Sequence, residues 1–293
     1  MVKKVSQLYS DIRHALIPTE GKDMAGVLAR DLLCNVTGKT KEQLLSDFDM
    51  YASEKVCGEA AIAVNRVIGG EPLAYVLGEW DFYGMTLHVD KRVLIPRDDT
   101  CAVTDLAIKK ALFLESTPRI LDLCTGSGCI GLAIAKRVKD ARVTLADISR
   151  DALAVAKQNI VTQKLSSRVS CICVDALQKP SDFLGKYDMI VSNPPYITSE
   201  EMKALPKSVK DYEPHLALHG GEDGLVFYRE IIKNYTAALK PRGYLCFEFG
   251  MGQGDAICRM LEENMFTILE RSRDYNDRER AVIAQRKEVY YGN

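Results

Sequence analysis

The tetrapeptide Asn193-Pro194-Pro195-Tyr196 combines a planar amide, two prolines and an aromatic ring directly after an apolar run at residues 188–192. Prolines lack N–H donors and hold φ near about −65°, so the backbone here is stiff and its carbonyl oxygens are free to accept hydrogen bonds. The asparagine amide both donates and accepts. Four such residues alone are more often a plain turn, but at the end of a strand in a cofactor-binding fold they indicate methyl transfer to a planar nitrogen.

A second stretch, residues 120–131, has the pattern of a strand, a tight glycine turn and the start of a helix. Gly126, Gly128 and Gly131 match G-x-G-x-x-G, a pattern that lets a ligand approach the backbone closely. Asp147 ends the next strand, nineteen residues after Gly128, where its carboxylate is placed to accept both ribose hydroxyl protons. The pattern predicts a nucleoside cofactor without deciding between NAD and S-adenosylmethionine.

Two further aspartates bear on that choice. Asp122 lies at the end of the first strand, where it would repel a pyrophosphate but suits the ammonium of a methionine moiety. Asp175 ends the third strand and is placed to accept the adenine amino group, although a turn or a helix N-cap is an alternative role. The predicted cofactor is therefore S-adenosyl-L-methionine. The predicted cofactor-binding residues are Asp122, Cys124, Thr125, Gly126, Ser127, Gly128, Asp147, Asp175, Ala176 and Asn193.

The elements that must position these residues fall into two parts. The first 70 residues have helical periodicity, and Thr40 and Ser53 stand before two further helical patterns as N-caps. One apolar face of the first part is formed by Leu8, Ile12, Leu16, Met24, Val27, Leu28 and Leu32. This part is expected to be a small helical bundle.

From about residue 98, strands and helices alternate, which predicts an α/β fold with a parallel sheet covered on both faces. The strand candidates in this alternation are 119–124, 142–148, 167–175, 187–193 and 243–250. Two last candidates, 266–274 and 279–286, are joined by only four residues. So short a link cannot form a parallel crossover, and this pair is expected to be an antiparallel hairpin.

We accordingly predict three segments. Residues 1–79 form an N-terminal helical domain, residues 80–97 a β-hairpin linker, and residues 98–293 the catalytic domain. The first segment carries no visible site chemistry. Presenting a surface to a protein substrate and acting as a stabilising cap both remain open for it.

Composition narrows the function classes. A net charge of −1 gives no support for an electrostatic grip on nucleic acid. The nine cysteines lack metal-ligand spacing and the four histidines form no metal pattern, so we expect no metal site and a reducing, cytoplasmic location. The N-terminus has no hydrophobic signal core, and no apolar run is long enough to cross a bilayer, so no membrane association is expected.

Residues 122–131 together with Asn193-Pro194-Pro195-Tyr196 resemble the class I S-adenosylmethionine-dependent methyltransferases that act on planar nitrogen. More specifically, nearly the whole chain resembles the PrmC/HemK family, the glutamine N5-methyltransferases of peptide chain release factors. The other blocks that carry this resemblance are 71–78, 95–97, 213–218, 220–225, 248–253 and 274–282. The resemblance implies a seven-stranded, mostly parallel sheet with a terminal antiparallel hairpin, preceded by a small all-α domain.

The same resemblance implies the reaction. A methyl group passes from S-adenosylmethionine to the side-chain amide nitrogen (N5) of the glutamine in the Gly-Gly-Gln motif of a release factor, which modulates translation termination. The Asn193 side-chain oxygen and the Pro194 carbonyl would each accept one N–H of that amide, and Tyr196 would pack against its face. Asn193, Pro194 and Tyr196 are thus the predicted catalytic residues, and Pro195 completes the substrate site.

One segment departs from the family pattern. The family follows Ile-Pro-Arg with Pro-Glu-Thr-Glu, whereas this chain follows Ile95-Pro96-Arg97 with Asp98-Asp99-Thr100-Cys101. The roles carried by that segment are therefore open. Arg97 is either a contributor to the site or an exposed salt-bridge residue.

The sequence also bears on several alternative functions. An adenine-N6 or guanine-N2 methyltransferase would need a basic groove, which the net charge disfavours. Methylation of a glutamine in another protein is harder to distinguish from methylation of a release factor. Asp122 and the terminal hairpin disfavour an NAD-dependent oxidoreductase. A non-catalytic adaptor would have little reason to keep Asp122, Asp147 and Asn193 together.

Overall fold

The computed structural model describes residues 3–114 and 117–288. They form two compact units, one made of residues up to Gly78 with Lys207–Tyr212, the other of Glu79–Pro206 with the residues from Glu213 onward. The hairpin expected as a linker thus belongs to the second unit, and a short segment from late in the chain belongs to the first. The functional division into three segments remains a prediction.

The first unit is helical. Its helices are α1 (Val5–Thr37), α2 (Lys41–Ser46), α3 (Glu54–Ile68), α4 (Leu73–Leu77) and α9 (Lys207–Lys210). Thr40 accepts from the Gln43 amide and Ser53 from the Val56 amide, so both predicted N-caps are confirmed. Tyr212, just after α9, donates from its hydroxyl to the Gly69 carbonyl at 3.1 Å.

One expectation for α1 was wrong. Met24 and Val27 are 51% and 40% exposed, although the apolar periodicity placed them on the buried face. Gly21 has a φ of 77° inside the helix, which interrupts the regular turn. Beyond this kink the buried positions are Ala25, Leu28, Ala29, Leu32 and Leu33, and Met24 and Val27 each lie one position away from them.

The second unit alternates strands and helices from residue 101 onward. Its strands are β1 (Glu79–Phe82), β2 (Met85–His88), β3 (Arg119–Leu123), β4 (Arg142–Asp147), β5 (Val169–Cys173), β6 (Tyr187–Ser192), β7 (Leu239–Glu248), β8 (Phe266–Arg273) and β9 (Glu279–Arg286). Its α-helices are α5 (Cys101–Ala111), α6 (Cys129–Arg137), α7 (Arg150–Thr162), α8 (Ser199–Ala204), α10 (Val226–Tyr235) and α11 (Gly254–Glu263). Short 3₁₀ helices include η1 (Asp98–Thr100) and η3 (His215–Ala217).

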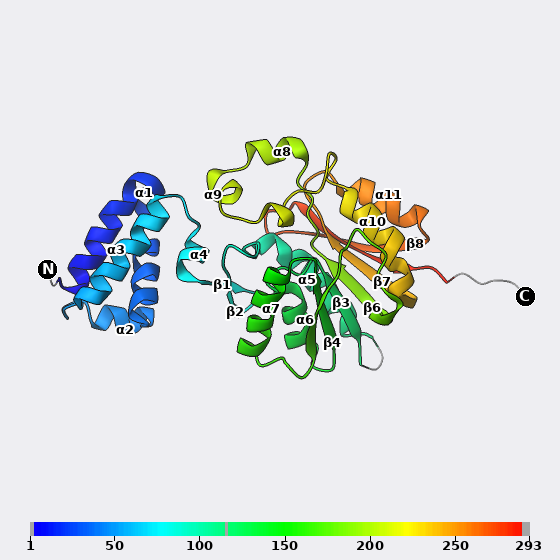
Figure 1. The fold of residues 1–293 in the computed structure, drawn as a ribbon, viewed down its shortest axis with the longest axis horizontal. Coiled ribbons are helices and arrows are strands. Elements are labelled where there is room, and N and C mark those ends of the chain that lie inside the picture. Colours follow the sequence, from blue (N-terminus) through cyan, green and yellow to red (C-terminus); the bar gives the residue numbers. More distant parts are fainter. Residues whose placement is uncertain (1–2, 115–116, 289–293) are drawn as a thin grey trace, which may run out of the picture. The chain divides into compact units, whose positions relative to one another are not determined.

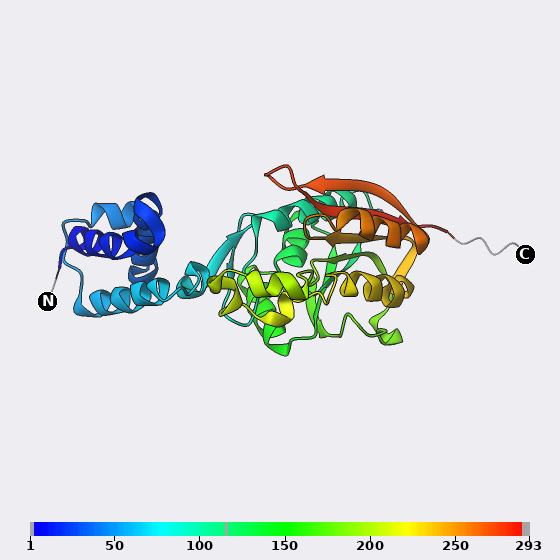
Figure 2. The same cartoon turned by 90° about the horizontal axis from the view of Figure 1, so that it is seen from above.

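The main sheet has seven strands in the order β5-β4-β3-β6-β7-β9-β8. Strands β3 to β7 run parallel to one another, while β9 pairs antiparallel with both β7 and β8 (Figures 1 and 2). The predicted α/β fold with a terminal antiparallel hairpin is confirmed. The chain order reverses direction between β3 and β6, and open α/β sheets bind ligands beyond the carboxyl ends of the strands at such a point.

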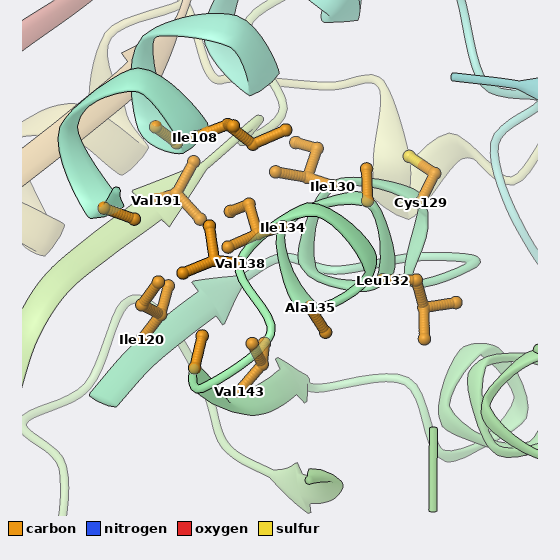
Figure 3. Packing of buried hydrophobic residues seen from close by; sticks show 14 of the residues in the cluster. Ile108, Ile120, Cys129, Ile130, Leu132, Ile134, Ala135, Val138, Val143 and Val191 are labelled. Atoms are coloured by element: carbon orange, nitrogen blue, oxygen red, sulfur yellow. The ribbon is translucent and has the colours of Figure 1, made fainter. Parts of the chain in front are cut away.

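Helices cover both faces of this sheet (Figure 1). On one face α5, α6 and α7 form a core in which Ile108, Ile134 and Val191 lie together (Figure 3). On the other face α10 and α11 pack with Leu121 and Phe247 of the sheet. The small β1–β2 hairpin contributes Phe82, Met85 and Leu87 to the first core, which explains why it belongs to this unit. No helix within the described ranges is long and apolar enough to cross a membrane.

Candidate active site

A cavity lies at the carboxyl ends of β3, β4, β5 and β6. Most of its wall is apolar, and most of the glycine loop, two of the predicted strand-end aspartates (Asp147 and Asp175) and part of the tetrapeptide border it. The residues that line it are Arg92, Val93, Leu94, Pro96, Thr100, Leu123, Cys124, Thr125, Gly126, Ser127, Cys129, Ile130, Asp147, Ile148, Ser149, Ala152, Val174, Asp175, Ala176, Leu177, Asn193, Pro195, Pro214, Leu216, Ala217 and Phe227.

The glycine loop joins β3 to α6. Cys124, Gly126 and Gly128 have positive φ angles of 61°, 55° and 86°, so this turn uses a conformation that glycine adopts without strain. The Gly128 amide donates to the Thr125 carbonyl at 2.9 Å, and α6 begins at the next residue. Four of the five loop residues predicted from the sequence, Cys124, Thr125, Gly126 and Ser127, line the cavity, and Gly128 does not.

Asp122 lies beneath this loop and does not line the cavity. Its side chain is fully buried, and one oxygen, Oδ2, accepts from the Thr125 hydroxyl at 2.6 Å and from the Gly131 amide at 2.9 Å. The other oxygen, Oδ1, has no hydrogen-bond partner among the described residues. Burial raises the pKa of this carboxyl to about 7. Asp122 therefore supports the loop and keeps one oxygen unpaired.

Asp147 and Asp175 both border the cavity. One oxygen of Asp147 accepts from the Gly126 amide at 2.9 Å and the other from the Ser149 amide at 2.9 Å, while burial raises the pKa of the carboxyl. Asp175 accepts from the Leu177 amide at 2.8 Å, which is the turn contact given above as its alternative role. Asp175 thus stabilises a turn and also lines the cavity wall.

The tetrapeptide begins directly after β6. Asn193 and Pro195 line the cavity, whereas Pro194 and Tyr196 do not. Tyr196 is half-buried, and its carbonyl accepts from Gln253 Nε2 at 3.0 Å. A Cβ on Gly250 would lie 3.1 Å from the Tyr196 ring, so the glycine makes room for that ring.

Sequence reasoning missed two polar neighbours of Asn193. Asn193 Nδ2 donates to Thr100 Oγ1 at 3.4 Å, and the buried Glu248 at the end of β7 lies close enough to the same amide for Asn193 to lower the pKa of its carboxyl. The strand register explains why Glu248 is a neighbour: Ser192 pairs with Phe247, so Asn193 stands beside Glu248. Arg97, whose role was open, forms an ion pair with the buried Glu213.

The cavity holds no candidate metal site. Over residues 3–114 and 117–288, no group of three or more histidine, cysteine or acidic side chains is placed to bind a metal ion. All nine cysteines are free thiols. The polar chemistry of the site therefore rests on carboxylates, backbone amides, prolyl carbonyls and the Asn193 amide.

Comparisons with known proteins identify the families that both parts of the chain match. Residues 8–78 match the PrmC N-terminal domain, and residues 104–240 match the methyltransferase small domain. A release factor glutamine methyltransferase of Clostridium acetobutylicum is 42% identical over 255 residues, which cover 87% of this chain and 89% of that protein. One of Haemophilus influenzae is 35% identical over 280 residues, covering 91% of this chain and 92% of that protein.

A solved structure shares the fold. The hMettl16 catalytic domain, in complex with MAT2A 3′UTR hairpin 6, aligns with a TM-score of 0.54 at 16% identity and covers 83% of this chain and 86% of that one. At this identity the likeness concerns the fold alone.

Proposed function

Because this chain belongs to the release factor glutamine methyltransferase family, we propose that it methylates the side-chain amide nitrogen (N5) of the glutamine in the Gly-Gly-Gln motif of a peptide chain release factor. It is a protein-glutamine methyltransferase, and its methyl donor is S-adenosylmethionine. The observation that carries the choice of acceptor is the place of Asn193, at a strand end and on the wall of the cavity that the glycine loop also lines.

The residues around the cavity fit the methyl donor. Asp122 lies beneath the loop that lines the cavity, and its unpaired Oδ1 would hold an ammonium group directly or through water. The carboxylate of Asp147 stands at the wall where ribose hydroxyls would be held. Asp175 and Ala176 would border the adenine, and the backbone of residues 124–128 would follow the methionine moiety. When bound, S-adenosylmethionine supplies an electrophilic methyl group on its sulfonium.

The chain's own residues would activate the glutamine amide. An amide nitrogen is a poor nucleophile because its lone pair is delocalised into the carbonyl group. The Asn193 side-chain oxygen and the Pro194 carbonyl would each accept one N–H, stabilise the positive charge that develops on nitrogen, and aim its lone pair into the cavity. Pro195 would bound the acceptor site and Tyr196 would support its backbone. The proton leaves after attack, so this account needs no general base at the tetrapeptide.

We also propose release factors as the protein partner and the cytoplasm as the location. The free state of all nine cysteines supports a reducing compartment. The net charge of −1 supports a protein rather than a nucleic-acid substrate. The helical unit would then present a surface to the release factor.

Incubation of the purified chain with labelled S-adenosylmethionine and a bacterial release factor tests this function. We expect mass spectrometry to find one added methyl group on the glutamine of the Gly-Gly-Gln peptide. A release factor in which this glutamine is replaced by asparagine serves as the control and should stay unlabelled. Label on added DNA, RNA or another protein, with none on that glutamine, would reverse the proposed acceptor.

A further inference from the structure

The position of Asn193 alone does not determine which end of its side-chain amide faces the cavity. The oxygen and nitrogen of a side-chain amide have nearly the same shape, so either can face the cavity. With Oδ1 toward the cavity the residue accepts an N–H bond from the substrate; with Nδ2 there it would repel that N–H bond. The side chains on the far side of the amide therefore determine whether the site can bind an acceptor nitrogen.

Two oxygen-bearing side chains lie behind it. Thr100, in η1, is 2% exposed, and its Oγ1 accepts from Asn193 Nδ2 at 3.4 Å. Glu248, the last residue of β7, is 1% exposed, and its carboxyl lies close enough to the Thr100 and Asn193 side chains for both to lower its pKa. Its second oxygen, Oε2, has no partner among the described residues. Thr100 borders the cavity, but Glu248 does not, so it stands behind Asn193 rather than beside the substrate.

Both side chains are held from several directions. The Tyr228 hydroxyl donates to the Glu248 carbonyl at 2.8 Å, which fixes the end of β7. The carbonyl of Thr100 accepts from the Thr104 hydroxyl at 2.8 Å. Asp99, the residue before Thr100, forms an ion pair of 2.9 Å with Arg280 of β9. The segment that departs from the family pattern is thus tied to the sheet through Asp99 and reaches Asn193 through Thr100.

We propose that Thr100 and Glu248 are positioning residues that together hold Nδ2 of Asn193, so that its Oδ1 faces the cavity and accepts the N–H bond of the acceptor amide. The inference rests on the proposed function and deepens it, because it names what orients the acceptor-binding group. While the Thr100 hydroxyl donates its proton toward the Glu248 carboxylate, which lowers the pKa of Glu248, a flipped amide would set Oδ1 against two oxygen acceptors and lose the hydrogen bond to Thr100.

The protonation of Glu248 gives this arrangement a pH dependence. Burial raises the pKa of the carboxyl to about 8, and the hydrogen bond of Thr100 opposes the rise. The ionised group only accepts hydrogen bonds and therefore selects Nδ2, whereas the protonated group can also donate to Oδ1 and tolerate the flipped amide. The rate should therefore rise as the pH increases through about 8.

Other titrating groups near Glu248 can be separated from it. Burial raises the pKa of Cys101 to about 11 and also raises those of Cys129, Tyr196 and Tyr228. Asp99 and Arg280 are paired with each other. At saturating S-adenosylmethionine, kcat does not depend on donor affinity, so the protonation of Asp122 does not change kcat through donor binding.

The test measures kcat, KM for the release factor and Kd for S-adenosylmethionine across this pH range. Glu248→Gln keeps a donor at every pH, so we expect kcat to fall about tenfold at high pH, its rise through about 8 to vanish, and the Kd to stay near the wild-type value. Thr100→Val should lower kcat, and Thr100→Ser should restore it. Glu270→Gln and Thr162→Val, at exposed positions, are the matched controls.

The outcomes separate the two proposals. Wild-type kcat and an unchanged pH profile in both Glu248→Gln and Thr100→Val would overturn the positioning role, as would a failure of Thr100→Ser to rescue. If Glu248→Gln does not fold, the threonine pair decides the question. No methyl transfer by the wild-type chain to the release factor glutamine would instead overturn the proposed function itself.

Discussion

At the residue scale, the site depends on buried carboxyl groups that keep an oxygen unpaired. Asp122 Oδ1 and Glu248 Oε2 are the two buried side-chain atoms of this kind in the described part of the chain. An unpaired buried oxygen costs free energy, so a native protein keeps one where a ligand or a proton completes it. For Asp122 the ligand would be the ammonium group of the methyl donor.

This assignment predicts that donor affinity depends on pH. Burial raises the pKa of Asp122 to about 7, so the carboxyl is protonated below that value and an ammonium group must displace the proton. Affinity should therefore rise by up to about tenfold per pH unit as the pH increases toward about 7, and level off above it. The α-ammonium of the donor loses its own proton only near about pH 8.

Isothermal titration calorimetry with S-adenosylmethionine at several pH values checks this. Asp122→Asn should bind more weakly and show no such slope, whereas Asp140→Asn, at an exposed position after α6, should keep the wild-type profile. A wild-type slope in Asp122→Asn would remove Asp122 from donor binding.

Residues near a strand end were predictable from the sequence, and their partners were not. Asp147 was predicted from its spacing to the glycine turn and Asp175 from its place at the end of the third strand. Both line the cavity, because parallel strands end at one edge of the sheet. The contact of Thr100 with Asn193 joins residues 93 positions apart, and it arises only when η1 packs against the end of β6. No local pattern encodes such a pair.

At the scale of elements, the tetrapeptide is held by a segment that returns from η3. The Ile197 amide donates to the Leu218 carbonyl at 2.9 Å, and the Gly220 amide donates to the Ile197 carbonyl at 2.8 Å. A Cβ on Gly220 would lie 2.7 Å from both the Pro195 oxygen and the Tyr196 Cα. These are backbone atoms, so the tetrapeptide would have to move to make room.

Gly220→Ala should therefore impair catalysis more than donor binding. We expect kcat to fall by at least about tenfold through displacement of the acceptor site, and the free energy of unfolding to fall by about 1–3 kcal/mol. Steady-state kinetics and denaturant unfolding measure the two effects. Gly58→Ala is the control: Gly58 lies in α3 with open space around its Cβ position, and alanine there should stabilise the helix slightly. Equal kcat in both variants would contradict this account of the segment.

Element prediction succeeded where the chain's periodicity is local. The short link between β8 and β9 already required an antiparallel pair, and the N-caps at Thr40 and Ser53 marked two helix starts. The second half of α1 was misjudged because a single glycine with positive φ shifts which positions face the core. The apolar pattern alone does not reveal this kink, which falls where Pro18 and Gly21 lie inside the helix.

At the scale of the whole molecule, two units divide the chain unequally. The second holds the entire cavity, including the tetrapeptide, the glycine loop and the residues around η3. The first carries α1 to α4, and α9 joins it from between β6 and β7. The sequence indicated the helical character of the first unit, but not that Lys207–Tyr212 belongs to it, because that contact depends on tertiary packing.

The central claim is that Asn193 grips the amide of a release factor glutamine. Its most direct test is the rate at which Asn193→Ala methylates the Gly-Gly-Gln peptide of an intact release factor, followed by mass spectrometry at saturating S-adenosylmethionine. Asn276→Ala, in the exposed turn between β8 and β9, is the matched control. We predict that kcat at saturating S-adenosylmethionine falls about a hundredfold in Asn193→Ala. Wild-type turnover by Asn193→Ala would contradict the account.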